Sequence, residues 1–408
     1  MSERYDVVVV GGGLLGCLTA WMAARDGARV LLADKDQVNQ HASGQNAGSL
    51  HFQLEYRMVE AVEYRMVEAG EEAARVAAEA MPLHLDAAAM WARLEDEVGE
   101  SLGVRQTGGL MVAENADQVG MLEFKAELER SWGLDVRTLD RSELDTVAPY
   151  LSRDVVAANL SALEGKADAR IAAPAVGRAA VAAGARVCAR SRLVGAHRTP
   201  AGWDVTLRET DRTGEVRTRT VRTAAVVLAA GVWTTELGRV FGAELPTVPL
   251  ALTMTVTSKV PSFIPHLVQH AGARLSLKQS LDKTVLIGGG WPARLMRDAD
   301  GVPQFDRKHQ LIPRSIAGNA RAAVNAVPAL ERVPAVRSWV GTTTVAPDQL
   351  PLVGAVRDAP GVFVATGGSA FTLGPSFARV LTGLLAGGSP DIDLTPYDPA
   401  RFTEGSTP

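Results

Sequence analysis

The 408-residue sequence predicts an α/β protein of two domains, and three observations carry that prediction. Val7-Val8-Val9-Val10 is a run of β-branched residues typical of a buried parallel strand, and it leads directly into glycines and a helical pattern. A second short strand, residues 28–33, ends in the carboxylate of Asp34. The chain is also longer than one hydrophobic core normally supports. Together these features predict a Rossmann-like domain joined to an α+β domain with a mixed or antiparallel sheet.

The glycines after the first strand form the pattern Gly11-x-Gly13-x-x-Gly16. In a strand-turn-helix unit, the first glycine allows a tight turn and the second lets the backbone approach a pyrophosphate. The third lets the helix pack on the strand, and the helix predicted over residues 17–24 directs the positive end of its dipole at the phosphates. The pattern therefore predicts a dinucleotide site, the alternative being a glycine-rich turn in an ordinary α/β protein.

Asp34 follows the glycines by about 20 residues, where an acid is expected to hold a ribose hydroxyl. An acid at this position favours a free 2′-hydroxyl over a 2′-phosphate, which argues against NADP. NAD and FAD both remain open at this point.

Bulk composition narrows the range of partners and compartments. A net charge of −4 gives no reason to expect nucleic acid or an anionic membrane as a partner. Cys17 and Cys188 are the only cysteines, so we expect a reducing compartment, no disulfide framework and no iron–sulfur cluster held by this chain. The uncharged run 7–24 approaches a membrane span in length, but three glycines interrupt it and Asp6 precedes it. We therefore expect no transmembrane segment and no signal peptide, and no residue set predicts a metal site.

Three later segments place small residues beside a loop or a strand end. The polar stretch 35–51 is a predicted loop whose small residues suit contact with a flat ligand, with a plain surface loop as the alternative. The buried strands 225–229 and 362–366 both lead into glycine, where a backbone must approach a neighbour closely. A helix is expected to begin near Gly374, because a proline follows it in the position of a first helical turn.

The domain boundaries follow from how these segments alternate with the rest of the chain. A helical pattern runs from 54 to 80, and short strands alternate with a helix over 83–152. β-rich segments return between 246 and 334, interrupted by a basic helix. We assign residues 1–82, 153–240 and 335–400 to a discontinuous nucleotide-binding domain, 83–152 and 241–334 to a substrate domain, and 401–408 to a flexible C-terminal tail.

A set of motifs runs in order along nearly the whole chain: Gly11-x-Gly13-x-x-Gly16, Asp34, Ser43-Gly44-x-Asn46-Ala47-Gly48, Ala229-Ala230-Gly231-Val232-Trp233, Trp339-Val340-Gly341, Pro347-Asp348-x-x-Pro351 and Gly367-Gly368. This set resembles the FAD-dependent D-amino-acid oxidase, glycine oxidase and sarcosine oxidase superfamily. The segments 47–51, 288–291 and 341–344 look most like the β subunits of opine oxidases and D-hydroxyproline dehydrogenases, and hydrogen cyanide synthase subunits are similar too.

The resemblance implies oxidation of the C–N bond of a secondary-amine amino acid, with hydride passing from the α-carbon to flavin N5. It implies a discontinuous FAD domain, with the helix near Gly374 directed at the pyrimidine end of the flavin. The residues implied to bind FAD are Gly11, Gly13, Leu14, Leu15, Gly16, Asp34, Lys35, Ser43, Gly44, Asn46, Ala47, Gly48, Ser49, Ala230, Gly231, Trp233, Gly341, Asp348, Gly367, Gly368, Leu373 and Gly374.

The sequence departs from this superfamily in two places. Sarcosine oxidases bind FAD covalently through a cysteine after the substrate domain, and neither cysteine of this chain lies there, so we expect noncovalent FAD. Glycine and D-amino-acid oxidases carry an arginine near the position that reads Gly341-Thr342-Thr343-Thr344 here, so another cation is needed to pair with a substrate carboxylate. The predicted catalytic residues are His51, Lys278 and Thr343, with Arg57 and Arg337 as further candidates for that cation.

The resemblance leaves three functions open for a chain that takes a small amino-acid or secondary-amine substrate. The first is the catalytic subunit of a dehydrogenase complex whose partner subunits carry a second flavin and an iron–sulfur cluster. The second is a stand-alone oxidase of glycine or sarcosine type that uses O₂, and the third is a non-catalytic FAD-binding subunit that relays electrons. The expected location is the cytoplasm, with contact to the inner membrane only through partners.

Overall fold

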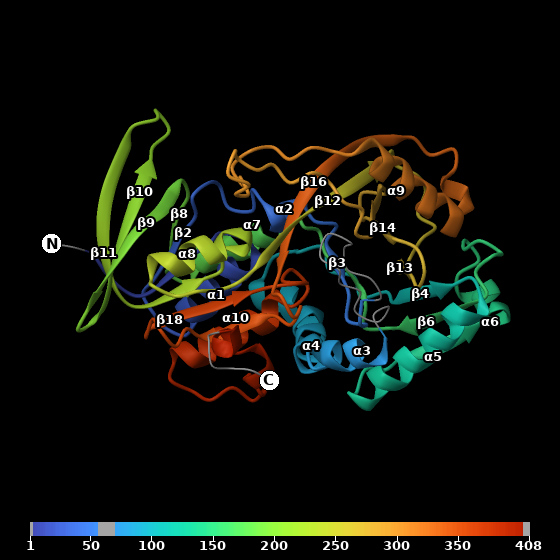
Figure 1. Cartoon of the computed structure of the whole chain (residues 1–408), viewed down its shortest axis with the longest axis horizontal. Coiled ribbons are helices and arrows are strands. Elements are labelled where there is room, and N and C mark those ends of the chain that lie inside the picture. The colour runs from blue at the N-terminus through green and yellow to red at the C-terminus, as the bar shows by residue number, and fades with distance from the viewer. Residues whose placement is uncertain (1–2, 56–69, 403–408) are drawn as a thin grey trace.

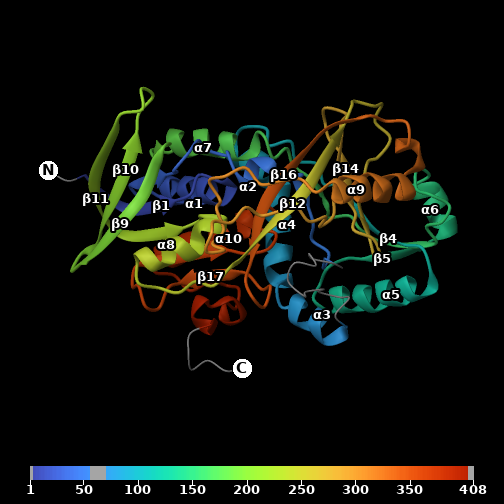
Figure 2. The same cartoon turned by 45° about the horizontal axis from the view of Figure 1, so that its top comes forward.

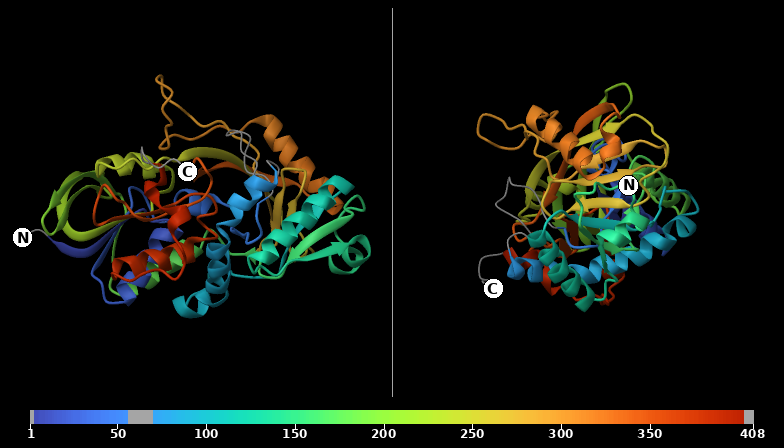
Figure 3. Two further views of the ribbon diagram at one scale, coloured as in Figure 1. Left: turned by 60° about the horizontal axis from the view of Figure 1, so that its bottom comes forward. Right: turned by 90° about the vertical axis from the view of Figure 1, so that its right-hand side faces the viewer.

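The computed structural model describes residues 3–55 and 70–402, and it contains two large sheets that lie side by side (Figure 1). The molecule is elongated in side view and compact when seen end-on (Figure 3). The predicted combination of a Rossmann-like sheet and a second, mixed sheet is confirmed.

The first sheet is mainly parallel and has the order β17-β18-β11-β1-β2-β8. Its strands are β1 (Arg4–Val10), β2 (Val30–Ala33), β8 (Arg186–Cys188), β11 (Val216–Leu228), β17 (Leu352–Ala355) and β18 (Val362–Thr366). β17 pairs with β18 in the antiparallel sense. The first half of β11 also forms an antiparallel ribbon with β10 (Gly202–Thr210) and β9 (Ser191–Thr199), which projects at the left of Figure 1.

The valine run of β1 is buried on both faces, as predicted for a central parallel strand. Because successive side chains of a strand point to opposite faces, Val7 and Val9 join the core under the helices α1 (Leu14–Arg25), α7 (Ala172–Ala182) and α10 (Gly374–Leu385). Val8 and Val10 join the core under α8 (Thr234–Val240) and the β9–β10 ribbon. Figure 2 shows α1 and α7 side by side on one face of this sheet.

β1 lies where the strand order reverses, with β2 and β8 on one side and β11 and β18 on the other. In open α/β sheets, ligands bind beyond the carboxyl ends of the strands at such a reversal. The glycine turn after β1 therefore occupies the position that the fold favours for a cofactor.

The second sheet has the order β16-β12-β15-β14-β13-β4-β6-β5, with only the β4–β13 pair parallel among its described neighbours. Its strands are β4 (Gly109–Ala113), β5 (Arg137–Asp140), β6 (Ala157–Ser161), β12 (Val248–Thr257), β13 (Leu267–His270), β14 (Ser276–Gln279), β15 (Val285–Gly288) and β16 (Ala335–Val345). Helices α6 (Arg141–Val147) and α9 (Pro313–Ala326) cover one face, and α5 (Ala116–Ser131) covers the other. In Figure 1, α9 lies above this sheet and α5 lies below it.

Short elements complete the chain between the two sheets and at its end. They are α2 (Ala42–Gln45), β3 (Ser49–Leu50), β7 (Gly165–Lys166), α3 (Glu71–Ala78), α4 (Met81–Val98) and the 3-10 turns η1 (Gly231–Trp233), η2 (Pro328–Leu330), η3 (Thr395–Tyr397) and η4 (Pro399–Phe402). β3 and β7 pair as a two-stranded sheet. Across residues 3–55 and 70–402, no helix combines the length and the apolar character needed to cross a membrane.

The predicted helix 54–80 is wrong at its start. Leu54 and Glu55 lie in an irregular segment, and residues 56–69 lie outside the described residues. Helix α3 begins only at Glu71, after Gly70 takes a φ of 105° that lies outside the helical region. The alanine- and glutamate-rich composition of this stretch favours a helix, but buried backbone contacts of the preceding loop, described below, hold residues 52–54 in another conformation.

Two strands and the chain end differ from the predicted boundaries. β6 and β16 both pair within the second sheet, although they fall in the ranges that we assigned to the nucleotide-binding domain. Arg401 and Phe402, assigned to a flexible tail, belong to η4, because Arg401 pairs with Asp348 at 2.7 Å. Residues 403–408 lie outside the described residues, and where the two domains divide stays a prediction.

Candidate active site

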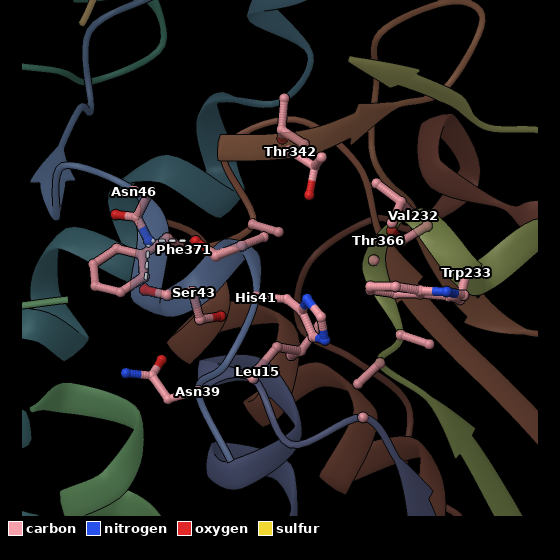
Figure 4. Close-up of a pocket in the computed structure, with 18 of the residues that line it drawn as sticks. Leu15, Asn39, His41, Ser43, Asn46, Val232, Trp233, Thr342, Thr366 and Phe371 are labelled. Carbon is pink, nitrogen blue, oxygen red and sulfur yellow. Dashed lines mark hydrogen bonds between the residues drawn. The ribbon is translucent and has the colours of Figure 1, made fainter. Parts of the chain in front are cut away.

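A cavity of about 370 Å³ lies between the carboxyl ends of the parallel strands and the second sheet, a size typical of small-molecule sites. Its wall is formed by residues at the ends of β1, β2, β11 and β18 and by residues of β12, β14, β15 and β16. Figure 4 shows side chains from distant parts of the sequence, among them Asn46, Trp233 and Thr342, around this one space. The predicted residues on its wall are Gly11, Gly13, Leu15, Asp34, Lys35, Ser43, Asn46, Ala47, Ser49, His51, Ala230, Gly231, Trp233 and Thr343.

The glycine turn is held so closely that side chains do not fit in it. A Cβ on Gly11 would lie 2.3 Å from the carbonyl oxygen of Ala229, and a Cβ on Gly16 would lie 1.8 Å from the carbonyl oxygen of Gly11. These contacts pack β1 against β11 and α1 against the turn. Gly13 differs, because its φ of −75° suits any residue and the nearest obstacle to a Cβ is the Ser43 hydroxyl at 2.8 Å. Gly13 therefore keeps space open at the start of α1, where free N–H groups favour a phosphate.

Asp34 organises the turn from the end of β2. Its carboxylate accepts the N–H of Gly12 at 2.6 Å through Oδ2 and the N–H of Asp36 at 2.7 Å through Oδ1. Because Asp34 also lines the cavity, one side chain joins the glycine turn to the position where a ribose is expected.

Replacing Asp34 with alanine is expected to weaken FAD binding by roughly ten- to a hundredfold, since a hydrogen bond to a charged group contributes about 1.5–3 kcal/mol. Titration of the apoprotein with FAD, followed by quenching of flavin fluorescence, measures the change in Kd. Asp26→Ala, at a side chain that is 60% exposed beyond the end of α1, is the matched control. An unchanged Kd in Asp34→Ala would restrict Asp34 to a structural role.

The predicted loop 35–51 lies along the cavity wall. Asn46 fixes its shape, because its Nδ2 donates to the carbonyl oxygen of Ser43 at 2.6 Å and its Oδ1 accepts the N–H of Gly48 at 2.5 Å. The indole of Trp339 on β16 donates to the carbonyl oxygen of Gln45 at 2.8 Å. This bond anchors the loop to the second sheet.

Several buried polar atoms on the cavity wall have no hydrogen-bond partner among the residues that the structure describes. They include Asn39 Oδ1, Ser49 Oγ, Ser191 Oγ and Thr366 Oγ1. Burying such atoms without partners costs free energy, so they indicate a ligand with several hydroxyl, carbonyl or phosphate groups. Together with the open N-terminus of α1 and the carboxylate of Asp34, they fit FAD, with the turn at its pyrophosphate and Asp34 at its adenosine ribose.

A cluster of charged and aromatic side chains encloses the end of the cavity near Asp34, and the sequence analysis identified only part of it. Lys35 Nζ lies 4.4 Å from the centre of the Trp233 ring and 2.7 Å from Asp306 Oδ1. Arg192 also pairs with Asp306 at 2.7 Å, and the ring of His41 meets Trp233 edge-on. Asp306 follows β12–β15 of the second sheet in sequence, so no local motif connects it with this end of the site.

The predicted catalytic residues separate into two groups. His51 and Thr343 line the cavity, and His51 Nε2 lies 3.2 Å from the hydroxyl of Ser276. Burial, together with the nearby Lys278 ammonium, lowers the pKa of His51 to about 3. His51 is therefore uncharged near neutral pH, where it serves as a hydrogen-bonding group and not as the cation for a carboxylate.

Lys278 does not line the cavity. It is buried behind the loop, and its ammonium donates to the carbonyl oxygens of Gly48 at 2.8 Å and of Ala167 at 3.0 Å. Burial, together with the nearby Lys166, lowers the pKa of Lys278 to about 7. Arg337 is exposed beside Trp339, and Arg57 lies outside the described residues.

Other residues predicted to bind FAD take structural positions. Asp348 forms a two-pronged ion pair with Arg401. Gly44 fits tightly against the carbonyl oxygen of Asn39, and Gly367 fits tightly against Pro351. The predicted residues that do not line the cavity are Leu14, Gly16, Gly44, Gly48, Gly341, Asp348, Gly367, Gly368, Leu373 and Gly374.

Sequence reasoning missed other residues of the cavity wall. Glu55, Thr342, Ser369, Phe371 and Thr372 also line the cavity. Ser369, Phe371 and Thr372 follow β18, which β11 and β1 separate from β2 and hence from Asp34. Phe371 and Thr372 stand only three and two residues before α10, so the predicted helix start at Gly374 was the signal that could have located them. Glu55 had no such signal, because the pattern around it is that of an amphipathic helix.

Comparisons with known proteins agree with this geometry. The chain is 26% identical over 420 residues to mitochondrial sarcosine dehydrogenase of Mus musculus and spans 42% of the length of that relative. It is 28% identical to glycine oxidase of Pseudomonas aeruginosa, over 98% of this chain and 99% of that protein.

Two solved structures share the fold. Glycine oxidase from Geobacillus kaustophilus superposes with a TM-score of 0.78 at 23% identity, covering 98% of this chain and 100% of that chain. L-proline dehydrogenase from P. horikoshii superposes with a TM-score of 0.80 at 19% identity, covering 98% of both. The DAO family model, described as FAD dependent oxidoreductase, matches residues 6–384, so the chain belongs to this family of FAD-dependent oxidoreductases.

Proposed function

We propose that the chain oxidises the C–N bond of a secondary-amine amino acid of the opine or D-hydroxyproline type. The observation that supports this proposal is the continuity of the cavity, which runs from Asp34 at the nucleotide end to Thr342 and Thr343 on the second sheet. The names of several relatives point to the same chemistry, since sarcosine and dimethylglycine dehydrogenases are named for N-methylated amino acids.

When bound, FAD supplies the acceptor for the hydride that leaves the substrate carbon. The protein contributes binding and orientation. The turn at Gly13 and the start of α1 hold the phosphates, and Asp34 holds the ribose. At the other end, Thr342 and Thr343 offer hydroxyl groups that orient a polar substrate.

The electron acceptor is part of the proposal. Cys17 and Cys188 are the only cysteines, too few to hold an iron–sulfur cluster, so we infer that electrons leave this chain to partner subunits that carry a second flavin and such a cluster. The chain would then be the catalytic subunit of a dehydrogenase complex. A stand-alone oxidase is the second candidate, because the chain aligns with glycine oxidase over nearly the full length of both proteins.

One preparation tests these functions. The purified chain is loaded with FAD, and opines, D-hydroxyproline, sarcosine and glycine are added without oxygen while the flavin absorbance is recorded. We expect bleaching with a secondary amine and recovery only after an artificial acceptor is added. Rapid recovery in air would support the oxidase instead, and no bleaching by any amine would overturn the proposed activity.

A further inference from the structure

A second, smaller cavity of about 160 Å³ adjoins the main one, and we refer to it as the side chamber. Its wall includes residues of α3, the start of α4 and the segment 348–351. Glu55 and Ser369 line both the main cavity and the side chamber. The pair therefore forms part of the boundary between the place where substrate is expected and the chamber behind it.

Glu55 is held at this boundary in a defined orientation. The Ser369 hydroxyl donates to Glu55 Oε1 at 2.8 Å, and within the described residues this is the only hydrogen-bond partner of the Glu55 side chain. A second carboxylate holds the segment just before Glu55, because Glu164 accepts the N–H groups of Phe52 and Gln53 at 2.8 and 2.9 Å. One carboxylate oxygen is thus engaged, and no bond to Oε2 is present among residues 3–55 and 70–402.

An amine that is oxidised to an imine must lose a proton as well as a hydride. Amino acids carry a protonated nitrogen near neutral pH, and a protonated nitrogen has no lone pair to form the C=N bond. Among the described residues of the cavity wall, the carboxylates are Asp34, Glu55 and Glu236. Asp34 and Glu236 lie at the nucleotide end, beside β2 and η1, so Glu55 is the carboxylate at the substrate end.

We propose that Glu55 is the general base that accepts the proton of the substrate ammonium, an assignment that rests on the proposed function. The N–H bond breaks and an O–H bond forms at Glu55 Oε2, which leaves a neutral amine. The nitrogen lone pair then forms the C=N bond as the α-carbon releases a hydride to FAD, and the product is an iminium ion. Charge balances, because one ammonium and one carboxylate give one neutral amine and one carboxylic acid.

The side chamber has polar side chains on its wall that can receive the accepted proton from Glu55. His84 Nδ1 and both polar atoms of the Gln349 side chain border this chamber and have no hydrogen-bond partner among the described residues. Buried polar groups of this kind are normally satisfied by water. Water held by His84 and Gln349 would accept the proton from Glu55 once the oxidised product has left.

The titratable neighbours of Glu55 do not compete with Glu55 for the substrate proton near neutral pH. Burial lowers the pKa of His51 to about 3 and that of His84 to about 4, so both are already neutral. Asp348 on the far side of the chamber is paired with Arg401. Burial raises the pKa of Glu55 above the ordinary value of a glutamate, while the Ser369 hydrogen bond opposes that rise. Lys278 has a pKa of about 7 but lines neither cavity.

The test is the pH dependence of flavin reduction by a secondary amine, measured anaerobically in single turnovers. In the unchanged protein, the rate should rise with pH as Glu55 ionises. In Glu55→Gln, which keeps an oxygen acceptor for Ser369, the rate at pH 7 should fall by about a hundredfold or more, the usual contribution of a general base. The rise should then shift toward the pKa of the free amine, near 10 if it resembles a lysine ammonium.

Three further variants test whether Glu55 itself determines the pH at which the rate rises. Ser369→Ala removes the donor that stabilises the ionised carboxylate, so the rise should move to higher pH. Lys278→Met should leave the rise in place, and so should Glu72→Gln, at an exposed glutamate in the first turn of α3. A Glu55→Gln protein that contains FAD and keeps the original rate and pH profile would overturn the assignment. Failure of the unchanged protein to be reduced by any amine would instead count against the proposed function.

Discussion

Replacing Gly13 with valine is expected to abolish FAD binding while the chain still folds. Gly13 has a φ of −75°, which valine tolerates, and the nearest atom to an added Cβ is the Ser43 hydroxyl, a single side-chain group that can shift if it gives up its hydrogen bond from the Leu14 N–H. The added isopropyl group would occupy the space at the start of α1 where the pyrophosphate is expected. We expect affinity for FAD to fall at least about a hundredfold, which corresponds to roughly 2.8 kcal/mol.

The measurement for Gly13→Val is the flavin absorbance of the purified protein together with its thermal unfolding without added FAD. Gly120→Val is the matched control, because Gly120 lies on α5 with no atom within 4 Å of an added Cβ. The control should retain its flavin. A Gly13→Val protein that binds FAD normally would show that the pyrophosphate does not lie at this turn.

The nucleotide end of the site could be predicted because its signal is local. The spacing of Gly11, Gly13 and Gly16 reflects contacts within one strand-turn-helix unit, such as the 1.8 Å approach that a side chain on Gly16 would impose. The acid at the end of β2 completes the same unit through its bond to the Gly12 N–H. Residues so close in sequence leave a pattern that can be recognised without the rest of the fold.

The substrate end could not be predicted in this way, because long-range contacts define it. Glu55 is held by Ser369, which lies 314 positions away, and Asp306 meets Lys35 across 271 positions. β16 carries Thr342 and Thr343 into the second sheet by pairing with β12. The sequence of neither strand indicates which strand it pairs with. The alternation of residues along β14 predicts that the Lys278 side chain points into the protein, and it does. It points to the carbonyl oxygen of Gly48, however, which lies behind the cavity wall.

The loop that carries His51 and Glu55 depends on a second group of buried side chains, and this group offers the largest expected effect on stability. Lys125 and Glu129 on α5 form an ion pair of 2.6 Å in which both side chains are fully buried. Glu129 also accepts the N–H of Leu54 at 2.6 Å, and Lys125 donates to the Gln53 side chain at 3.2 Å. The pair thus connects α5, which packs on the second sheet, to the backbone just before Glu55.

Replacing Lys125 with methionine is expected to destabilise the protein by about 3–5 kcal/mol, the usual cost of removing one partner from a buried ion pair. Burial already raises the pKa of Glu129 above its ordinary value of 4.5, and loss of the ammonium would raise it further. A group whose pKa is higher in the folded state stabilises the fold below its unfolded pKa and loses that contribution as pH rises. The deficit of Lys125→Met should therefore be smallest near pH 4, around the ordinary pKa of a glutamate, and grow as the pH rises above it, by up to about 1.4 kcal/mol per pH unit.

Urea unfolding of the unchanged protein and of Lys125→Met across this pH range measures the effect. Arg93→Met is the matched control, because Arg93 and Glu97 form a pair of the same spacing on α4 with side chains that are 54% and 32% exposed. An exposed helical pair contributes only about 0.3–0.5 kcal/mol, so the control should unfold almost normally at every pH. Equal and small deficits in the two variants would contradict this account, because they would mean that the buried pair does not fix the loop on which His51 and Glu55 depend.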